Sequence, residues 1–277
     1  MNLSARAAFC VALPLLLLAG LAVLLPFGWR SADLLLGCVQ GHDCAVHELL
    51  ADSYYLMALW NTVWISALST LIALALGLAA AVSLAALPGW RQPATLLASL
   101  GANFAGVPLA VAMTLLFGAQ GIVSDSLSLA GLPLPFDLYR NSGLLVAYVC
   151  FQVPLALLLL MAPVQQLSGE SLLDAAATLG AGPGLFWRRV GMPMLLPSLV
   201  EVGSLLFANA AAAYATPFAL SGTATNVLAV RIAALVSGDI FSQPELSALL
   251  ALLMFAMLVA VIGGGRWLAR RLRSSAT

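Results

Sequence analysis

The chain carries very little charge for its length. Of its 277 residues only 8% are charged and 62% are hydrophobic, whereas a soluble domain carries about 25% charged residues. Too few polar side chains are therefore present to coat a large soluble core. The mean hydropathy of +1.05 is typical of a protein whose surface lies against lipid. The composition predicts an integral membrane protein.

Lysine is absent, and neither sign of charge is in excess. All eleven basic residues are arginine, eleven residues are acidic, and the formal net charge is zero. Because nucleic-acid binding requires a basic surface, this balance argues against a nucleic-acid partner. The sequence also lacks a Walker A loop and a G-x-S-x-G elbow. With no paired catalytic residues either, we expect a protein that is not an enzyme.

Long apolar runs are what the chain has instead. Six of them reach or approach the roughly 20 residues that cross a bilayer as a helix. We expect an all-α polytopic membrane protein with six transmembrane helices, the first of them retained and not a cleaved signal. Pro108, Pro154 and Pro217 fall inside these spans and should bend or open them. The expected spans are Ala7–Phe27, Leu56–Leu87, Ala94–Phe117, Leu144–Val164, Leu199–Leu220 and Leu246–Ile262.

The arginines predict the orientation of the chain. If the N-terminus lies in the cytoplasm, eight arginines fall in inside segments and three in outside segments. The positive-inside rule then places both termini in the cytoplasm. The inside arginines are Arg6, Arg91, Arg188, Arg189, Arg266, Arg270, Arg271 and Arg273, and the outside ones are Arg30, Arg140 and Arg231.

The middles of the spans lack ionisable residues, and Glu201 comes closest, near the cytoplasmic face. Secondary transporters and proton pumps generally need such residues at mid-membrane depth, so an ion-coupled transporter or channel is the less favoured alternative. The polar residues of the spans either bond between helices or line a water-filled path, and both interpretations stay open. Asn209 and Thr216, seven apart, should share one helix face. The candidate path residues are Asn103, Gln152, Asn209, Tyr214 and Thr216.

The first outside loop, CVQGHDCAVHELL, contains two cysteines and two histidines. Cys38, His42, Cys44 and His47 have the residue types of metal ligands. A disulfide between Cys38 and Cys44 is the favoured interpretation, because the outer side of a bacterial inner membrane is oxidising. Two free thiols are the remaining alternative, and we expect no metal site.

The segment from Ser168 to Pro197 is too polar and too broken to cross a bilayer. Its first half predicts a short helix capped by Ser168 or Ser171 and ended by Gly180 in the left-handed conformation. In the second short helix, LFWRRVGMP, Phe186 and Val190 should share one side and the two arginines should be exposed. Pro193 and Pro197 are expected to break the path before the fifth span. Such a helix is either a connector at the membrane surface or a knob that fits a groove in another protein.

This segment resembles the cytoplasmic signature of permease subunits of type I ABC importers, which is E-A-A, three residues, G, nine residues, then I-x-L-P. Asp174-Ala175-Ala176 is followed after three residues by Gly180. Val190-Gly191-Met192-Pro193 follows after nine more, with Asp, Val and Met replacing Glu, Ile and Leu of the family pattern. The similarity extends from ALWNTVWISALSTLIALALG in the second span to the sixth span, through ANFAGVPLAVAM and AYATPFALSGT.

The resemblance implies a fold, a mechanism and partners. The helix would be a coupling helix in a cleft of a separate ATPase, with Asp174, Ala175, Ala176 and Gly180 as core positions and Val190 and Pro193 fixing the return. ATP and Mg²⁺ would bind the ATPase, so no cofactor is expected on this chain. The other implied partners are a second permease subunit, identical or not, and a periplasmic binding protein.

The same resemblance implies alternating access in a bacterial inner membrane. The matching branch carries polyamines, iron, thiamine or phosphonates. We expect a polyamine such as spermidine or putrescine, with thiamine, ferric iron and aminoethylphosphonate as alternatives. The expected organisation is residues 1–55 as a first helix and periplasmic loop, 56–265 as the permease domain with its coupling loop at 167–197, and 266–277 as a basic tail.

Overall fold

The computed structural model describes residues 52–167, 170–237 and 244–274, together with residues 18, 21 and 29. Every regular element in these residues is helical. The first expected span apart from residues 18 and 21, and the Cys38–Cys44 pair, lie outside the described residues. The chain divides into two compact units, residues 57–231 with 256–277 and residues 1–56 with 232–255.

The described segments of the smaller unit are helical, apart from Asp52. It holds the first residues of α3 (Ser53–Ala85), the second half of α12 (Leu228–Ser237) and the first third of α13 (Pro244–Ser274). The side chain of Asp52 accepts the Tyr54 N–H at 2.9 Å. This bond satisfies one of the free donors at the start of α3.

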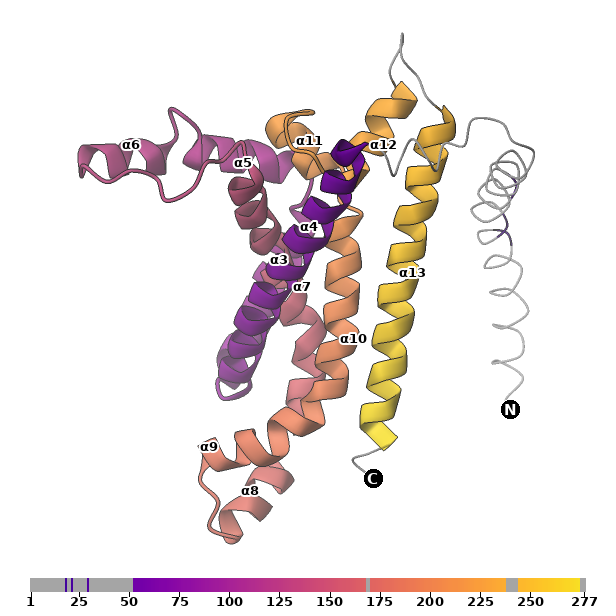
Figure 1. Ribbon diagram of the computed structural model, residues 1–277. Coiled ribbons are helices and arrows are strands. Elements are labelled where there is room, and N and C mark those ends of the chain that lie inside the picture. The colour runs from indigo at the N-terminus through magenta and orange to yellow at the C-terminus, as the bar shows by residue number, and fades with distance from the viewer. Residues whose placement is uncertain are drawn as a thin grey trace. The chain divides into compact units, whose positions relative to one another are not determined.

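The larger unit is built on long helices that pack through small residues. α3, α7 (Asn141–Leu167) and α10 (Met192–Ala211) are its longest described elements, and α4 (Pro88–Asn103) packs along α7 (Figure 1). A Cβ placed on Gly77 of α3 would lie 2.6 Å from the Cβ of Ala156 on α7. Glycine therefore allows the two backbones to approach closely, as small residues commonly do between membrane helices.

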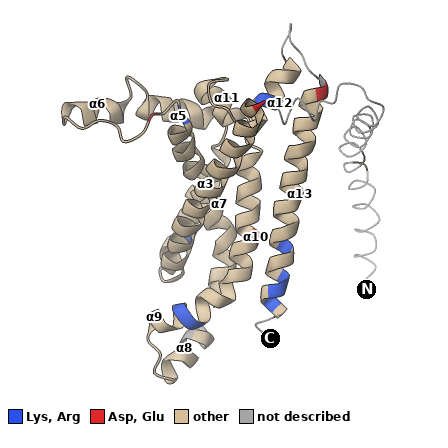
Figure 2. Ribbon diagram, in the orientation of Figure 1, with Lys and Arg blue, Asp and Glu red and all other residues tan. Residues whose placement is uncertain are grey.

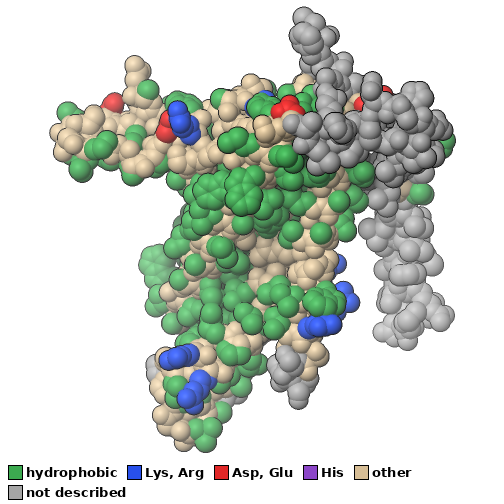
Figure 3. All heavy atoms as spheres, in the orientation of Figure 1, with side chains coloured by type: hydrophobic (Ala, Val, Ile, Leu, Met, Phe, Trp, Pro, Cys, Tyr) green, Lys and Arg blue, Asp and Glu red, His purple; other side chains and the backbone are tan. Residues whose placement is uncertain are grey.

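The surface of the larger unit is apolar over its middle. Among the described residues, five helices are long and apolar enough to cross a membrane. Large hydrophobic side chains such as Leu71, 63% exposed, and Leu115, 65% exposed, lie on the surface of these helices, and green side chains cover the middle of the molecule in Figure 3. Trp60, Trp90 and Trp267 are exposed near helix ends, where tryptophan commonly marks the membrane–water interface. This is a multi-pass membrane protein.

Two of the expected spans are interrupted, which corrects the sequence-based boundaries. The expected span 94–117 is divided between α4 and α5 (Val107–Phe117), with Gly106 at φ +79° between them. The expected span 199–220 is divided between α10 and α11 (Ala215–Ser221). Pro108 and Pro217 stand in the first turns of the restarted helices, where their missing N–H costs no bond. α7 in contrast continues through Pro154.

The expectation that Pro193 and Pro197 break the chain path is wrong. The helix continues from Gly184 to Ala211, through α9 (Pro183–Phe186), the π-helical turn η1 (Trp187–Gly191) and α10. At the end of η1 the Met192 N–H bonds the Trp187 carbonyl, five residues back. Pro193 follows directly, in the first turn of α10, so it stands where the helix changes from this π-helical bonding to α-helical bonding.

Arg91 ties the C-terminal end of α3 to the start of α4. Its Nε donates to the Leu84 carbonyl at 3.1 Å, and its Nη2 donates to the Ala85 carbonyl. These carbonyls belong to the last turn of α3 and have no partner within the helix. A cation at a helix C-terminus also complements the helix dipole.

Candidate functional site

The segment singled out by its spacing forms a short helix with a defined end. α8 (Glu170–Thr178) is followed by Gly180 at φ +76°. The Ala181 N–H bonds the Ala176 carbonyl and the Gly180 N–H bonds the Ala177 carbonyl, both at 2.9 Å. These two bonds are the pair that defines a Schellman helix end. The prediction that Gly180 ends this helix in the left-handed conformation is confirmed.

The apolar face of α8 is only partly covered by the described residues. Leu172 is 38% exposed, Ala175 is exposed, Ala176 is half-buried, and Leu179, the residue after α8, is 88% exposed. Alanines keep the helix narrow, so a partner's groove could approach its backbone closely. An exposed apolar face on a short, capped helix suits helix-in-groove recognition.

The return from α8 to the membrane is anchored by aromatic side chains. Phe186 is 2% exposed and meets Trp187 edge to face, with ring centroids 5.9 Å apart. Arg188 and Arg189 are exposed and Val190 is half-buried, as the sequence predicted. These arginines are visible beside α9 in Figure 2. The loop is therefore fixed to the larger unit on one side and open on the other.

The two helix interruptions lie against each other. The Gly106 N–H, between α4 and α5, donates to Thr216 Oγ1 of α11 at 3.0 Å. Thr216 is only 2% exposed, and α5 and α11 are neighbours in Figure 1. Interrupted backbone at membrane depth is tolerated where protein or a water-filled cavity satisfies its polar groups. Here the Thr216 hydroxyl satisfies one such group.

The five candidate path residues divide between buried and exposed positions. Gln152 is fully buried, where its Nε2 donates to Ser69 Oγ at 3.2 Å and its Oε1 accepts from Thr70 Oγ1 at 3.4 Å. Asn103 and Asn209 are exposed. Asn209 and Thr216 do not share a helix face, because the interruption after Ala211 places them on different helices.

Tyr214 stands in the second interruption with an exposed ring. The residue is 39% exposed and stacks on Phe218, with centroids 5.2 Å apart and planes 22° from parallel. Asn103 lies at the end of α4, immediately before the first interruption. Exposed polar and aromatic side chains thus flank both interruptions.

A polar network that the sequence did not single out joins the N-terminal ends of α3 and α7 to the segment before α12. Asn61 Nδ2 donates to the Asn226 carbonyl at 3.0 Å, and Asn141 Nδ2 donates to Asn61 Oδ1 at 3.3 Å. Arg231 Nε donates to Asn226 Oδ1 at 2.7 Å. The available signal is the polar spacing on one face of α3, which is buried at Asn61, Thr62, Ser66, Ser69 and Thr70.

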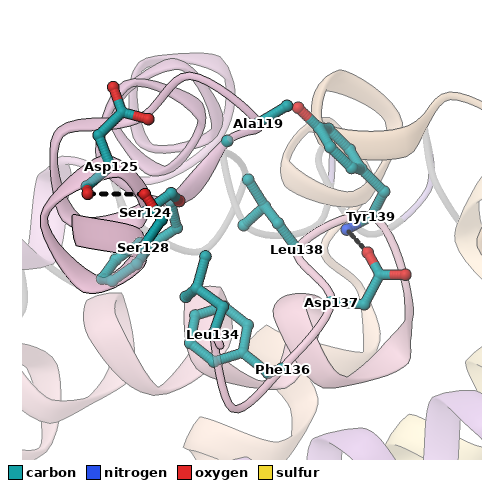
Figure 4. Close-up of a pocket in the computed structure, with 11 residues that line it drawn as sticks. Ala119, Ser124, Asp125, Ser128, Leu134, Phe136, Asp137, Leu138 and Tyr139 are labelled. Carbon is teal, nitrogen blue, oxygen red and sulfur yellow. Dashed lines mark hydrogen bonds between the residues drawn. The ribbon is translucent and has the colours of Figure 1, made fainter. Parts of the chain in front are cut away.

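Two cavities open at this end of the larger unit. One, of about 730 Å³, is bordered by the asparagines of the polar network. The other, of about 340 Å³, lies between α5, α6 (Ile122–Leu129) and residues 134–139. In Figure 4 the polar side chains of Asp125 and Asp137 lie at its edges and are not directed at one another. Neither cavity brings together an acid–base or nucleophilic pair.

The chain is similar in sequence to known permease proteins. No family model matches it. It is 30% identical over 238 residues to the probable ABC transporter permease protein y4fN of Sinorhizobium fredii, covering 84% of this chain and 40% of that protein. It is 30% identical to the thiamine transport system permease protein ThiP of Salmonella typhimurium over 216 residues, 76% of this chain and 39% of that protein.

A shorter match joins the chain to the molybdenum transport system permease protein ModB of Mycobacterium bovis. The two are 28% identical over 117 residues, which are 42% of this chain and 43% of that protein. The chain spans about 40% of the length of the y4fN and ThiP relatives.

Solved structures show the same fold. A chain of a bacterial alginate ABC transporter, in complex with an alginate pentasaccharide-bound periplasmic protein, superposes with a TM-score of 0.72 at 14% identity and covers 96% of both chains. A chain of the MetNI methionine ABC transporter gives a TM-score of 0.60 at 15% identity, covering 78% of this chain and 95% of that one. The spaced motif, the relatives and the fold agree: the chain is similar in sequence to permease proteins of ABC transporters and shares the fold of ABC transporter membrane subunits.

Proposed function

We propose that this chain is the membrane-spanning subunit of an ATP-driven importer and that α8 is the helix through which a separate ATPase drives it. The observation that carries this proposal is the exposed apolar face of α8, which ends at Gly180 in a Schellman motif. Asp174, Ala175, Ala176 and Gly180 form the docking surface, and Val190 and Pro193 fix its return. ATP and Mg²⁺ bind the ATPase, where hydrolysis takes place.

The proposed complex contains two permease subunits, two ATPase subunits and a periplasmic binding protein. The named relatives are permeases, and one structural neighbour is in complex with a solute-bound periplasmic protein. Two permease subunits, the same or different, enclose the solute path and alternate its opening between the two sides. The chain supplies half of this path.

We further propose that the path runs past the paired interruptions. Asn103, Asn209 and Tyr214 are exposed beside them and can contact a solute. Gln152 and Thr216 are buried and bonded within the chain, so they shape the path by holding its walls. Discontinuous helices form the solute sites of many transporters.

The proposed orientation places α8 and both termini in the cytoplasm of a bacterial cell. In Figure 2 the arginines of η1 lie at the end of the larger unit that carries α8, and the acidic residues around α5 to α7 lie toward the other end. This asymmetry is the one expected from the positive-inside rule.

The solute is proposed to be small and polar, with thiamine as the first candidate to test. The relatives reported above include permeases named for thiamine and molybdenum. None of these names supports the polyamine expected from the sequence, and spermidine and putrescine therefore follow thiamine in the test series. Ferric iron and aminoethylphosphonate complete it.

The docking proposal is tested by reversing charge on α8 and co-purifying the ATPase in detergent. The Asp174→Arg variant should lose the ATPase, whereas Asp125→Arg, a matched reversal on exposed Asp125 of α6, should retain it. Equal retention of the ATPase, with unchanged ATPase stimulation, by both variants would refute the proposal. An ion-coupled transporter would instead show uptake by this chain alone that an uncoupler abolishes.

A further inference from the structure

The π turn η1 lies between the segment that carries α8 and the membrane span that begins with α10. The helix from Gly184 to Ala211 is 28 residues long and passes through Trp187–Gly191 without interruption, as the ribbon from α9 into α10 shows (Figure 1). A π turn inserts an extra residue into a helix and weakens its regular bonding. Any movement of α8 that reaches α10 along this helix must pass through that turn.

Trp187 braces the turn by lying directly on Gly191. A Cβ built on Gly191 would lie 2.5 Å from Cε3 and 3.1 Å from Cζ3 of the Trp187 ring. Such contact is too short for any side chain, so only glycine allows the ring to rest on the backbone. Gly191 is buried and Trp187 is half-buried, so the ring shields the backbone of the turn at this point.

The Trp187 ring makes two further contacts. Phe186, 2% exposed, meets the Trp187 ring edge to face. Trp187 packs against the buried cluster that includes Leu160 and Leu195. The indole thus contacts the π turn, Phe186 and the core, and it braces the turn on the side that faces the core, whereas Arg188 and Arg189 on the other side are exposed.

We propose that Trp187 and Gly191 are positioning residues that join α9, η1 and α10 into one rigid body, so that ATPase-driven displacement of α8 is carried into the span. This inference rests on the proposed function. Transmission between distant sites requires elements that move as a unit between discrete arrangements. An unbraced π turn would act as a bend and absorb the displacement.

The substitutions that test this are confined to the brace. Gly191→Ala should displace the indole, and Trp187→Ala should remove it. Trp187→Phe should keep an aromatic ring on Gly191 and preserve coupling. The matched control is Gly184→Ala in the same helix, because a Cβ at Gly184 meets nothing within 4 Å.

The first measurement needs no partner. The four native cysteines are changed to serine, and the protein is placed in lipid nanodiscs. Spin labels are then attached at positions 179 and 205, where Leu179 and Leu205 are 88% and 46% exposed. The distance distribution between the labels should be narrow in the parent and in Gly184→Ala. It should widen to about twice the parent width in Gly191→Ala, because the turn then bends. Equal widths in all three proteins would overturn the inference.

The second measurement uses the complex with its ATPase, trapped with ATP and vanadate. Labels at Leu205 and Leu115, both exposed, should change separation on trapping in the parent. Gly191→Ala should retain the ATPase but lose at least about half of this change, since the displacement is absorbed at the turn. The single variant Trp187→Phe should show the same change as the parent. A folding defect in Gly191→Ala would instead lower protein yield and ATPase retention together.

The double variant separates the brace from a simple steric clash. Trp187→Ala with Gly191→Ala leaves room for the added methyl group but supplies no brace, so coupling should stay impaired. Recovery in the double variant, or an undiminished change in Gly191→Ala, would overturn the inference. If the parent itself fails to bind the ATPase, the proposed function fails, whereas the label widths still report on the brace.

Discussion

At the scale of single residues, the end of α8, the proposed docking helix, depends on one backbone conformation. Gly180 has a φ of +76°, and a Cβ placed on it would meet no atom within 4 Å. A side chain there is disfavoured by backbone strain and not by crowding. The sequence allowed this conformation to be predicted, because a helix-ending glycine followed by a proline is a local signal.

Replacing Gly180 with valine should therefore cost about 1–2 kcal/mol of local stability and fray the end of α8. Hydrogen exchange at residues 176–181 should accelerate, and ATPase co-purification should fall. Gly182→Val is the control, because Gly182 is equally open and does not have a positive φ. Unchanged exchange in Gly180→Val would contradict this account of the helix end.

Thr62 shows what local sequence could not predict. Its Oγ1 donates to the Ala58 carbonyl and accepts the Leu228 N–H, both at 2.8 Å. The first bond is local and expected in a helix. The second joins residues 166 positions apart, and no periodicity in either segment signals it.

Thr62→Val should leave the buried Leu228 N–H without an acceptor, at a cost of about 1–3 kcal/mol. The midpoint of thermal unfolding in detergent should fall, and it should be preserved in Thr62→Ser, which keeps the hydroxyl. If valine and serine gave equal midpoints, the bond would contribute nothing to stability.

At the scale of elements, the apolar runs predicted the long helices well and their interruptions poorly. α3 and α7 follow the expected spans closely because uninterrupted apolar sequence is sufficient to define them. The interruptions before Val107 and after Ala211 lie in sequence that is still apolar, and a hydrogen bond between Gly106 and Thr216, 110 positions apart, joins them. Only Pro108 and Pro217 signalled them locally, and Pro154 gave the same signal without an interruption.

The close approach of α3 to α7 is testable at Gly77. Gly77→Leu should force the helices apart, because even a Cβ would lie 2.6 Å from that of Ala156, and overpacking costs about 1–3 kcal/mol or more. Thermal unfolding should begin at a lower temperature. Gly89→Leu, where a Cβ has open space, should unfold like the parent, and matching midpoints for the two variants would exclude a tight contact at Gly77.

At the scale of the whole molecule, the proposed orientation rests on the distribution of charge. The sequence predicts a basic cytoplasmic side, and in the proposed orientation α8 lies on that side. The structure also shows Arg273 paired with Glu201 at 2.9 Å, joining the C-terminal third of α13 to α10. Both side chains are partly exposed, so this pair contributes at most about 1 kcal/mol. No sequence pattern related these two residues.

The proposed orientation predicts which positions an impermeant maleimide reaches in intact spheroplasts. Exposed Ser126 and Gly182 are replaced one at a time by cysteine, in protein whose native cysteines are serine. Ser126→Cys on α6 should be labelled from outside, and Gly182→Cys should be labelled only after lysis. The reverse pattern would invert the topology.

The central claim, that α8 seats in a separate ATPase, is tested most directly by photocrosslinking. In one variant benzoylphenylalanine replaces Leu179, which directly follows α8 and is 88% exposed. In a control variant it replaces Leu129 on α6, which is 90% exposed. Irradiation of cells that express the complete transporter should crosslink the ATPase to position 179 and not to position 129. Absence of an ATPase crosslink at position 179, or an equal crosslink at both positions, would contradict the account.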